Sequence, residues 1–185
     1  DIDPNTYNIS TIALENKLIK AKKNNKLPKV LIVVHLAGLP CDMYEIYLLS
    51  KRYKFKIIED ASHAINAWYK GQRIGNCKYS EITIFSFHAV KIITSGEGGI
   101  AITNNRKLAT KMRLLRSHGI TRDKKLFQYK SINKWYYEQI LLGYNYRLTE
   151  FQAALVINQL KRINQLTKKR HSISNLYDSL LKKLP

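Results

Sequence analysis

The sequence has few cysteines, no long apolar run and few acidic residues, and each shortage excludes a class of protein. Its two cysteines, Cys41 and Cys77, are far apart and belong to no Cys-x-x-Cys or Cys/His cluster, which excludes a disulfide framework and a zinc site. No apolar run approaches the roughly 20 residues that cross a bilayer, and the start, DIDPNTYNIS, lacks the regions of a signal peptide. We therefore expect a cytoplasmic chain with no membrane partner and no metal ion.

The shortage of acids leaves a large positive charge, because 32 Lys and Arg against 13 Asp and Glu give a formal net charge of +19. Such a field attracts nucleic acid or phosphorylated small molecules. The lysines are dispersed through helix-like stretches, however, and no nucleic-acid-binding motif organises them. We interpret them as solvated helix faces and expect no nucleic-acid partner. A basic nucleic-acid-binding module stays open as an alternative of a different class.

Short apolar runs alternate with amphipathic ones along the chain, and this alternation predicts an α/β fold. VLIVV (30–34) and FKIIED (55–60) are predicted strands that flank a predicted helix at about 42–53. The resulting βαβ unit makes the two strands parallel and brings Asp60 to a carboxyl end. The remaining predictions are a hairpin or turn around Gly71 and Gly75, strands at 81–87 and 98–103, a helix over 104–119, an irregular excursion over 120–144 and a last helix from 149 to about 180.

Helix starts are predicted from capping residues. Asp42 and Glu45 have the spacing of an N-cap and its third helical residue, and Thr149 and Gln152 have the spacing of a capping box. Asn105 lies in the Asn pair that opens the helical segment predicted over 104–119, and Asn is a common N-cap.

Asp60, Ser86 and Lys91 all follow predicted strands, where open α/β sheets collect their ligands. A carboxylate at this place can pair with a pyridinium nitrogen, which keeps the ring protonated and able to accept electrons. On Asp60 alone, an Asp that caps the next turn is the more frequent alternative.

Lys91 lies among Ser, Thr and Gly in SFHAVKIITSGEGG (86–99). Burial favours the neutral amine of a lysine, which can condense with an aldehyde to a Schiff base. A solvated surface lysine is the alternative. Ser86 can donate to a phosphate, and the three glycines of the loop permit a close approach of its backbone, which makes the special lysine the better interpretation.

Two histidines and a turn add weaker signals. His63 follows Asp60 and His88 precedes Lys91 by three residues each, and a hydrogen-bonded core histidine is an equal alternative for both. Asn145 and Arg147 directly precede a helix start, which is either an anion-binding place or only a helix-entry turn.

Together, EDASHA, SFHAVKIITSGEGG, LRSHG and GYNYRLTEFQAAL resemble the DegT-type sugar aminotransferases, which are pyridoxal-phosphate enzymes of the aspartate aminotransferase fold. The four motifs in this order are specific as a set, and the resemblance runs over nearly the whole chain. It implies a three-layer α-β-α architecture with a mostly parallel sheet, as part of the large domain of a fold type I pyridoxal-phosphate enzyme.

The resemblance implies a cofactor role for five residues. Lys91 forms the Schiff base with pyridoxal 5'-phosphate and shuttles the proton between cofactor and substrate carbons. Asp60 pairs with the pyridine nitrogen, His63 lies by the ring, and Ser86 binds the cofactor phosphate. Asn145 reaches the phosphate bound by the other subunit, which implies a homodimer.

The resemblance also implies a substrate. Arg147 and His88 help with the anionic or sugar groups of a nucleotide sugar, His88 as a second catalytic candidate. SFHAVK and the segment around Asn145 are most similar to the family branch that converts a UDP-linked 4-keto-6-deoxy-N-acetyl sugar to its 4-amino form, with glutamate as donor, in pseudaminic acid biosynthesis. Ile92 departs from the commoner Pro or Asn, so a sugar of the 4-amino-arabinose or perosamine type stays open. A lysine rather than a histidine at position 91 implies transamination rather than dehydration.

Finally, the resemblance implies a division of the chain. Residues 1–147 correspond to the central part of the large domain, and residues 148–185 to a long helix that leads toward a small C-terminal domain absent from this sequence. Family members also carry a phosphate-binding Gly-Thr turn before the equivalent of residue 1. An inactive fragment is therefore the last alternative.

Overall fold

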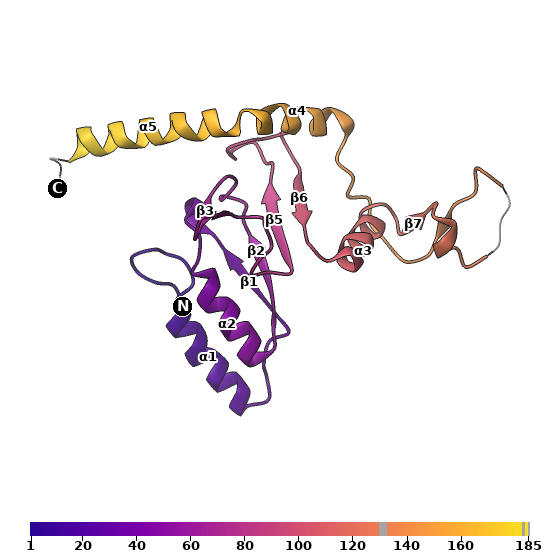
Figure 1. Cartoon of the computed structure of the whole chain (residues 1–185), viewed down its shortest axis with the longest axis horizontal. Coiled ribbons are helices and arrows are strands. Elements are labelled where there is room, and N and C mark those ends of the chain that lie inside the picture. Colours follow the sequence, from indigo (N-terminus) through magenta and orange to yellow (C-terminus); the bar gives the residue numbers. More distant parts are fainter. Residues whose placement is uncertain (130–132, 183, 185) are drawn as a thin grey trace.

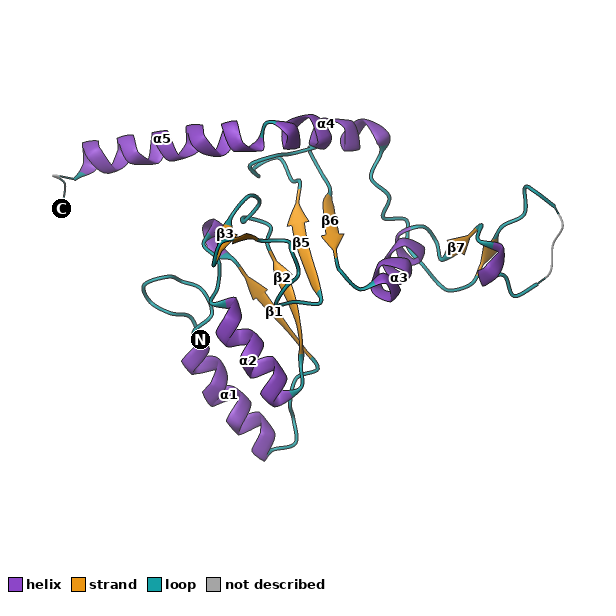
Figure 2. Ribbon diagram, viewed as in Figure 1, coloured by secondary structure: helices purple, strands orange, loops and turns teal. Residues whose placement is uncertain are grey.

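The computed structural model describes residues 1–129, 133–182 and 184 (Figures 1 and 2). The longer elements are helices α1 (Thr11–Lys23), α2 (Met43–Tyr53), α3 (Arg106–Arg116), α4 (Glu150–Lys161) and α5 (Ile163–Leu181), and strands β1 (Val30–Val34), β2 (Lys56–Asp60), β5 (Ile82–Ser86) and β6 (Gly99–Ile102). The shorter elements are strands β3 (Trp68–Tyr69), β4 (Gln72–Arg73), β7 (Ile120–Thr121) and β8 (Glu138–Gln139), and 3-10 turns η1 (Leu36–Gly38) and η2 (Lys124–Leu126).

The central sheet has the strand order β1-β2-β5-β6. Strands β1, β2 and β5 are parallel, and β6 pairs with β5 in the antiparallel sense. Helix α2 connects β1 to β2, which confirms the predicted βαβ unit. Because the loop 87–98 contains no crossover helix, β6 returns alongside β5 in the opposite direction. This mixed, mostly parallel sheet confirms the expected α/β class.

Helices α1 and α2 lie against one end of the sheet (Figure 1). Met43 and Ile46, three positions apart on α2, share a buried cluster with Val33 of β1 and Ile57 of β2, and all four are at most 2% exposed. Leu18 of α1 is buried in the same cluster. Full burial of such a side chain contributes about 1.5–3 kcal/mol, so this cluster fixes the parallel pair that carries Asp60.

A second buried cluster lies under α4 and the start of α5. Phe85 of β5 packs with Ile93 of the following loop, Val156 of α4 and Ile163 of α5. Ile93 is fully buried although it lies only two residues after Lys91. The loop that carries Lys91 is therefore anchored in the core.

The sheet has a second face on which the apolar side chains stay exposed. Ile32, Val34 and Ile84 are 60, 44 and 38% exposed. Ile32 and Val34 of β1 are in register with Ile58 and Asp60 of β2. Asp60 is in turn in register with Ile84 of β5. These side chains therefore share one face of the sheet. An outer helical layer of the kind the resemblance implies would cover them.

Most helix starts agree with the capping predictions. Asn105 Oδ1 accepts the main-chain N–H groups of Lys107 (2.9 Å) and Leu108 (3.2 Å), and Thr149 forms the predicted capping box with Gln152. Asp42 is the N-cap residue of α2 as predicted, but its side chain makes no cap hydrogen bond. The Asp42 carboxylate accepts the hydroxyl of Tyr69 instead.

The second half of the chain departs from the predicted boundaries. The last helix breaks at Arg162 (φ −106°, ψ 8°) into α4 and α5. The helix predicted over 104–119 ends at Arg116. The excursion over 120–144 contains the short β7–β8 pair, and its residues 130–132 lie outside the described part of the chain. Among the described residues no helix is long and apolar enough to span a membrane.

Candidate active site

The carboxyl ends of the parallel strands meet at one edge of the sheet. Val34 of β1, Asp60 of β2 and Ile84 of β5 are neighbours in register, and Ser86 lies two residues beyond Ile84 on the same face. At about 3.3 Å per residue, Ser86 lies roughly 7 Å further along its strand than the level of Asp60. The register therefore brings Asp60 and Ser86 to the same face and the same edge.

Asp60 is half-buried, and only one of its carboxylate oxygens has a partner among the described residues. Oδ1 accepts the main-chain N–H of Ser62 at 3.0 Å. This bond is the turn cap that the sequence left open as an alternative. Oδ2 has no donor within the described residues, so Asp60 can cap its turn and still bind a cationic ligand.

The turn after β1 contacts the segment after β2. The main-chain N–H of Ala37 donates to Nδ1 of His63 at 3.3 Å. Gly38 has φ +89°, and a Cβ at this position would lie 2.8 Å from the carbonyl oxygen of His63. The hydrogen bond holds the exposed His63 ring against the turn after β1, and the close approach at Gly38 packs that turn against the His63 backbone.

The segment from Ser86 to Lys91 folds into a series of tight turns. Ser86 Oγ accepts the main-chain N–H of His88 (3.2 Å), His88 Nδ1 accepts that of Val90 (3.3 Å), and the carbonyl of His88 accepts that of Lys91 (3.0 Å). Because Ser86 Oγ is an acceptor here, its own hydrogen is available to donate. Lys91 is half-buried, and its amine has no hydrogen-bond or ion-pair partner among the described residues.

The Gly-Glu-Gly-Gly turn closes this loop against β5. A Cβ at Gly99 would lie 2.8 Å from the carbonyl oxygen of Phe85, and one at Gly98, where φ is +141°, would lie 2.6 Å from Leu148 Cδ1. Both positions therefore require glycine. Glu97 places a carboxylate oxygen 3.8 Å from His88 Nε2.

Two glutamines of α4 hold the same loop, and sequence analysis assigned neither of them to the site. The Gln159 side chain makes two hydrogen bonds to the main chain of Thr94. Its Oε1 accepts the Thr94 N–H (3.1 Å), and its Nε2 donates to the Thr94 carbonyl (2.6 Å). Gln152, predicted only as a capping residue, also donates to the carbonyl of Glu97 (3.1 Å). Their separation of seven residues, two helical turns, was the available signal.

Asn145 and Arg147 lie in the segment between β8 and α4. Asn145 forms an isolated bridge with Ser117, just after α3. Arg147 lines a hollow of about 770 Å³ together with Arg113 and Arg116 of α3. Neither the Asn145 nor the Arg147 side chain has a hydrogen-bond or ion-pair partner within the described residues. The register thus brings Asp60 and Ser86 together, with His63 three residues after Asp60 and with His88 and Lys91 in the loop that follows Ser86. Asn145 bridges to Ser117 instead.

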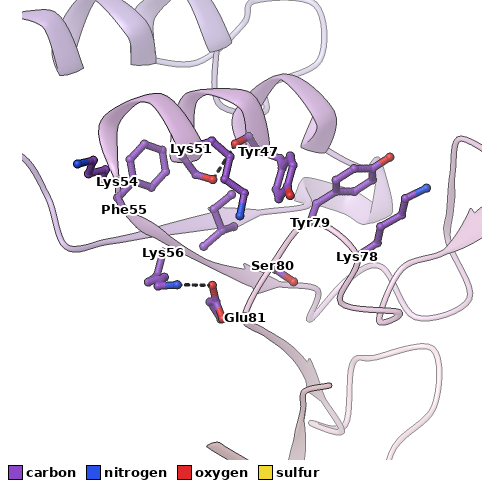
Figure 3. Close-up of a pocket in the computed structure, with 11 residues that line it drawn as sticks. Tyr47, Lys51, Lys54, Phe55, Lys56, Lys78, Tyr79, Ser80 and Glu81 are labelled. Carbon is purple, nitrogen blue, oxygen red and sulfur yellow. Dashed lines mark hydrogen bonds and ion pairs between the residues drawn. The ribbon is translucent and has the colours of Figure 1, made fainter. Parts of the chain in front are cut away.

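A separate, lysine-rich hollow of about 410 Å³ lies near the amino ends of β2 and β5 (Figure 3). Lys56 pairs there with Glu81 at 2.9 Å, and Lys51 Nζ lies 4.7 Å from the centre of the Tyr47 ring. Lys56 begins β2 and Asp60 ends it, so the two residues are about 13 Å apart along the strand. This hollow is therefore separate from the Asp60 edge.

The groups at the Asp60 edge fit the pyridoxal phosphate that the resemblance implies. Asp60 offers a carboxylate oxygen and Lys91 an amine, both unpaired among the described residues, and Ser86 offers a hydroxyl hydrogen. These are the partners that a pyridinium nitrogen, an aldehyde and a phosphate require. The glycines at 98 and 99 leave no side chain in the turn that follows.

Residues 1–185 match the DegT/DnrJ/EryC1/StrS aminotransferase family. The chain belongs to this family. It is 43% identical over 178 residues to an uncharacterized protein of Methanocaldococcus jannaschii, covering 96% of this chain and 44% of that protein. It is 42% identical over 181 residues to the UDP-4-amino-4,6-dideoxy-N-acetyl-beta-L-altrosamine transaminase of Campylobacter jejuni, covering 98% and 44%.

Solved structures agree with this assignment. Helicobacter pylori PseC, an aminotransferase involved in pseudaminic acid biosynthesis, superposes with a TM-score of 0.84 at 33% identity, over 99% of this chain and 45% of that one. An aminotransferase of the same family from Brucella abortus superposes with a TM-score of 0.84 at 29% identity, over 100% and 46%. The chain therefore has the aminotransferase fold and spans a little under half the length of these relatives.

Proposed function

We propose that the protein containing this chain is a pyridoxal-phosphate-dependent aminotransferase that acts on a nucleotide-linked 4-keto-6-deoxy sugar. Bound pyridoxal phosphate supplies an electron sink that stabilises negative charge on the substrate carbon. The observation that carries the proposal is the half-buried Lys91, whose amine is unpaired among the described residues and whose loop begins at Ser86, on the same face and edge of the sheet as Asp60.

The residues of the edge divide the work of binding and proton transfer. Asp60 binds the pyridine nitrogen through its second oxygen and keeps it protonated, while Ser86 donates its hydroxyl hydrogen to the phosphate. Lys91 would hold the cofactor through its amine and, once the amino group of the donor has displaced that amine, would serve as the neutral base that moves a proton. His63 orients the ring beside Asp60, and His88 assists at the substrate side.

A homodimer completes the proposed site. Asn145 lies outside the Asp60 edge of its own chain, with an amide that is unpaired within the described residues, and donates to the phosphate bound by the partner subunit. Arg147, with the two arginines of α3 beside it, binds the negative charge of a nucleotide or of the amino donor. We assign residues 1–147 to the central part of the large domain and the helical residues from 148 onward to the connection with a second, smaller domain.

Two relatives support a more specific substrate. The Campylobacter jejuni relative is named for a UDP-4-amino-4,6-dideoxy-N-acetyl sugar, and PseC is described by its place in pseudaminic acid biosynthesis. We infer the same class of substrate here, a UDP-linked 4-keto-6-deoxy-N-acetyl sugar with glutamate as amino donor.

The test uses the full-length protein, including any coding sequence that flanks this chain. After incubation with pyridoxal phosphate we expect a visible absorption band, and borohydride reduction followed by peptide mapping should place the cofactor on Lys91. A panel of UDP- and TDP-linked keto sugars with glutamate then identifies the substrate. A label on another lysine, or turnover that persists in Lys91→Ala, would refute the assignment.

A further inference from the structure

A buried polar network lies directly behind Asp60, on the opposite face of β2. His35, Glu59 and Thr83 are 0, 4 and 0% exposed. His35 Nε2 and Glu59 Oε2 are 2.9 Å apart, and Thr83 Oγ1 donates to Glu59 Oε1 at 3.1 Å. Ser80 also donates its hydroxyl to Glu59 Oε1. None of these residues belongs to the proposed cofactor contacts.

The hydrogen bonds of His35 define its tautomer. Nδ1 of His35 accepts the main-chain N–H of Cys41 at 3.1 Å, so Nδ1 carries no hydrogen. The hydrogen is therefore on Nε2, which donates to Glu59. Glu59 accepts from three side chains, one from the end of β1, one from β5 and one from the loop before β5.

The Glu59 carboxylate is costly to bury. A carboxylate inside a protein loses its hydration and is tolerated only when its oxygens are hydrogen-bonded. The neighbouring Cys41 thiol reflects the same surroundings, because burial raises its pKa to about 11 and the Glu59 carboxylate adds to the rise. An apolar residue at position 59 would fill this layer at lower cost, which points to a role beyond packing.

The network is connected to the site through the backbone. The main-chain N–H of His35 donates to the carbonyl oxygen of Asp60 at 3.1 Å. Glu59 directly precedes Asp60, and both are paired in register with neighbours on β1 and β5. Two residues after His35, Ala37 donates to the His63 ring. His35 thus starts the turn that contacts both Asp60 and His63.

We propose that His35 and Glu59 are positioning residues that hold Asp60 and His63 in place from behind the sheet. This inference rests on the proposed cofactor function. The Glu59 carboxylate ties the end of β1 and the start of β5 to β2, and His35 transmits that restraint to the Asp60 carbonyl and, through its turn, to His63. Loss of the network lets the Asp60 carboxylate shift relative to the cofactor nitrogen.

The test compares His35→Gln and Thr83→Val with the wild type in the full-length protein. A glutamine side chain in place of His35 cannot both donate to Glu59 and accept from Cys41 in the geometry of the ring. A valine in place of Thr83 removes one donor to Glu59 with little change of shape.

We expect the dissociation constant of pyridoxal phosphate to rise about tenfold in His35→Gln and about threefold in Thr83→Val, because residues that support a binding shell typically affect it by 10–100-fold when removed. The induced circular dichroism of the bound cofactor should weaken in the same order, and kcat should fall while KM for glutamate stays within about twofold.

Thr103→Val is the matched control. It makes the same substitution and breaks a hydrogen bond of 2.6 Å to the carbonyl of Glu81, at the far end of β6 from the site. This variant should leave the dissociation constant of pyridoxal phosphate and the induced circular dichroism of the bound cofactor unchanged. If Thr83→Val and His35→Gln match Thr103→Val while the wild type binds cofactor, the positioning role is wrong and the proposed function stands. If the wild type binds no cofactor, the proposed function fails first.

Discussion

The two ends of the central sheet both carry lysines, but they differ in whether the lysine has a partner. At the amino end, Lys56 pairs with Glu81 and Lys51 lies over the Tyr47 ring, in an open hollow (Figure 3). At the carboxyl end, the half-buried amine of Lys91 is unpaired among the described residues, in a loop held by its own turns and by α4. The difference lies in the surroundings of the lysines.

Helix α2 explains why the amino end needs positive charge. Its last turn contains Lys51 and Arg52, and Lys54 is its left-handed C-cap (φ +59°). Cations at this place compensate the negative end of the helix dipole and its free carbonyls. The lysines of the amino end therefore stabilise a helix end, and a high net charge does not by itself indicate a binding site.

Removal of Lys91 should give the largest effect. Lys91→Ala in the full-length protein should lower transaminase kcat by about 10³-fold or more, because it removes both the proposed cofactor attachment and the proposed proton carrier. Lys54→Ala, at the opposite end of the sheet, is the control and should keep kcat within about twofold. Similar losses in the two variants would mean that net charge, and not position, matters.

Removal of the Asp60 charge should come next. Asp60→Asn keeps the size and the turn cap to Ser62 but loses the charge that we propose pairs with the cofactor nitrogen. A charge-assisted hydrogen bond contributes about 1.5–3 kcal/mol, which corresponds to about a 10–100-fold weaker binding of pyridoxal phosphate, measured by fluorescence titration. Asp123→Asn, which caps the distant turn η2, should bind as the wild type does.

The sequence predicted the layout of this edge well because strand ends are local features. The predicted strands end within one residue of β2 and β5, with Asp60 and Ser86 as the last residues of these strands and Lys91 in the loop after β5. Register then placed Asp60 and Ser86 on one face without any further information. Periodicity and capping were sufficient here because each signal involves residues close in the chain.

Contacts between distant segments could not be predicted in this way. Asp42 has the sequence of an N-cap, but the hydroxyl of Tyr69, 27 residues away, takes its carboxylate. Gln159 contacts Thr94 across 65 residues, and the pairing of His35 with Glu59 spans 24. A single sequence contains no signal for such pairs, and helical or strand periodicity accounts for each residue without them.

Removal of one restraint on the Lys91 loop should lower kcat by a smaller factor. Gln159→Ala breaks both hydrogen bonds to Thr94. At about 1 kcal/mol for each bond, the loop should lose roughly 2 kcal/mol of restraint, and kcat should fall about tenfold with faster hydrogen exchange over residues 92–97. Gln165→Ala, an exposed position on α5, should leave both unchanged. Unchanged exchange in Gln159→Ala would mean that the buried Ile93 alone holds the loop.

The smallest effect should come from the amino-end lysines. The triple variant Lys51→Ala, Lys54→Ala, Lys78→Ala removes three charges from the hollow, and exposed substitutions of this kind usually change stability by no more than about 0.5 kcal/mol each. We expect kcat/KM for the keto sugar to stay within about twofold and elution from a cation exchanger to shift to lower salt.

Wild-type protein should also fail to retain DNA or RNA at moderate salt, since the lysines of this end are engaged with a helix end and with neighbouring side chains rather than arranged for phosphate contacts. Tight, steeply salt-dependent retention that the triple variant loses would reverse the comparison and make the amino end a functional surface.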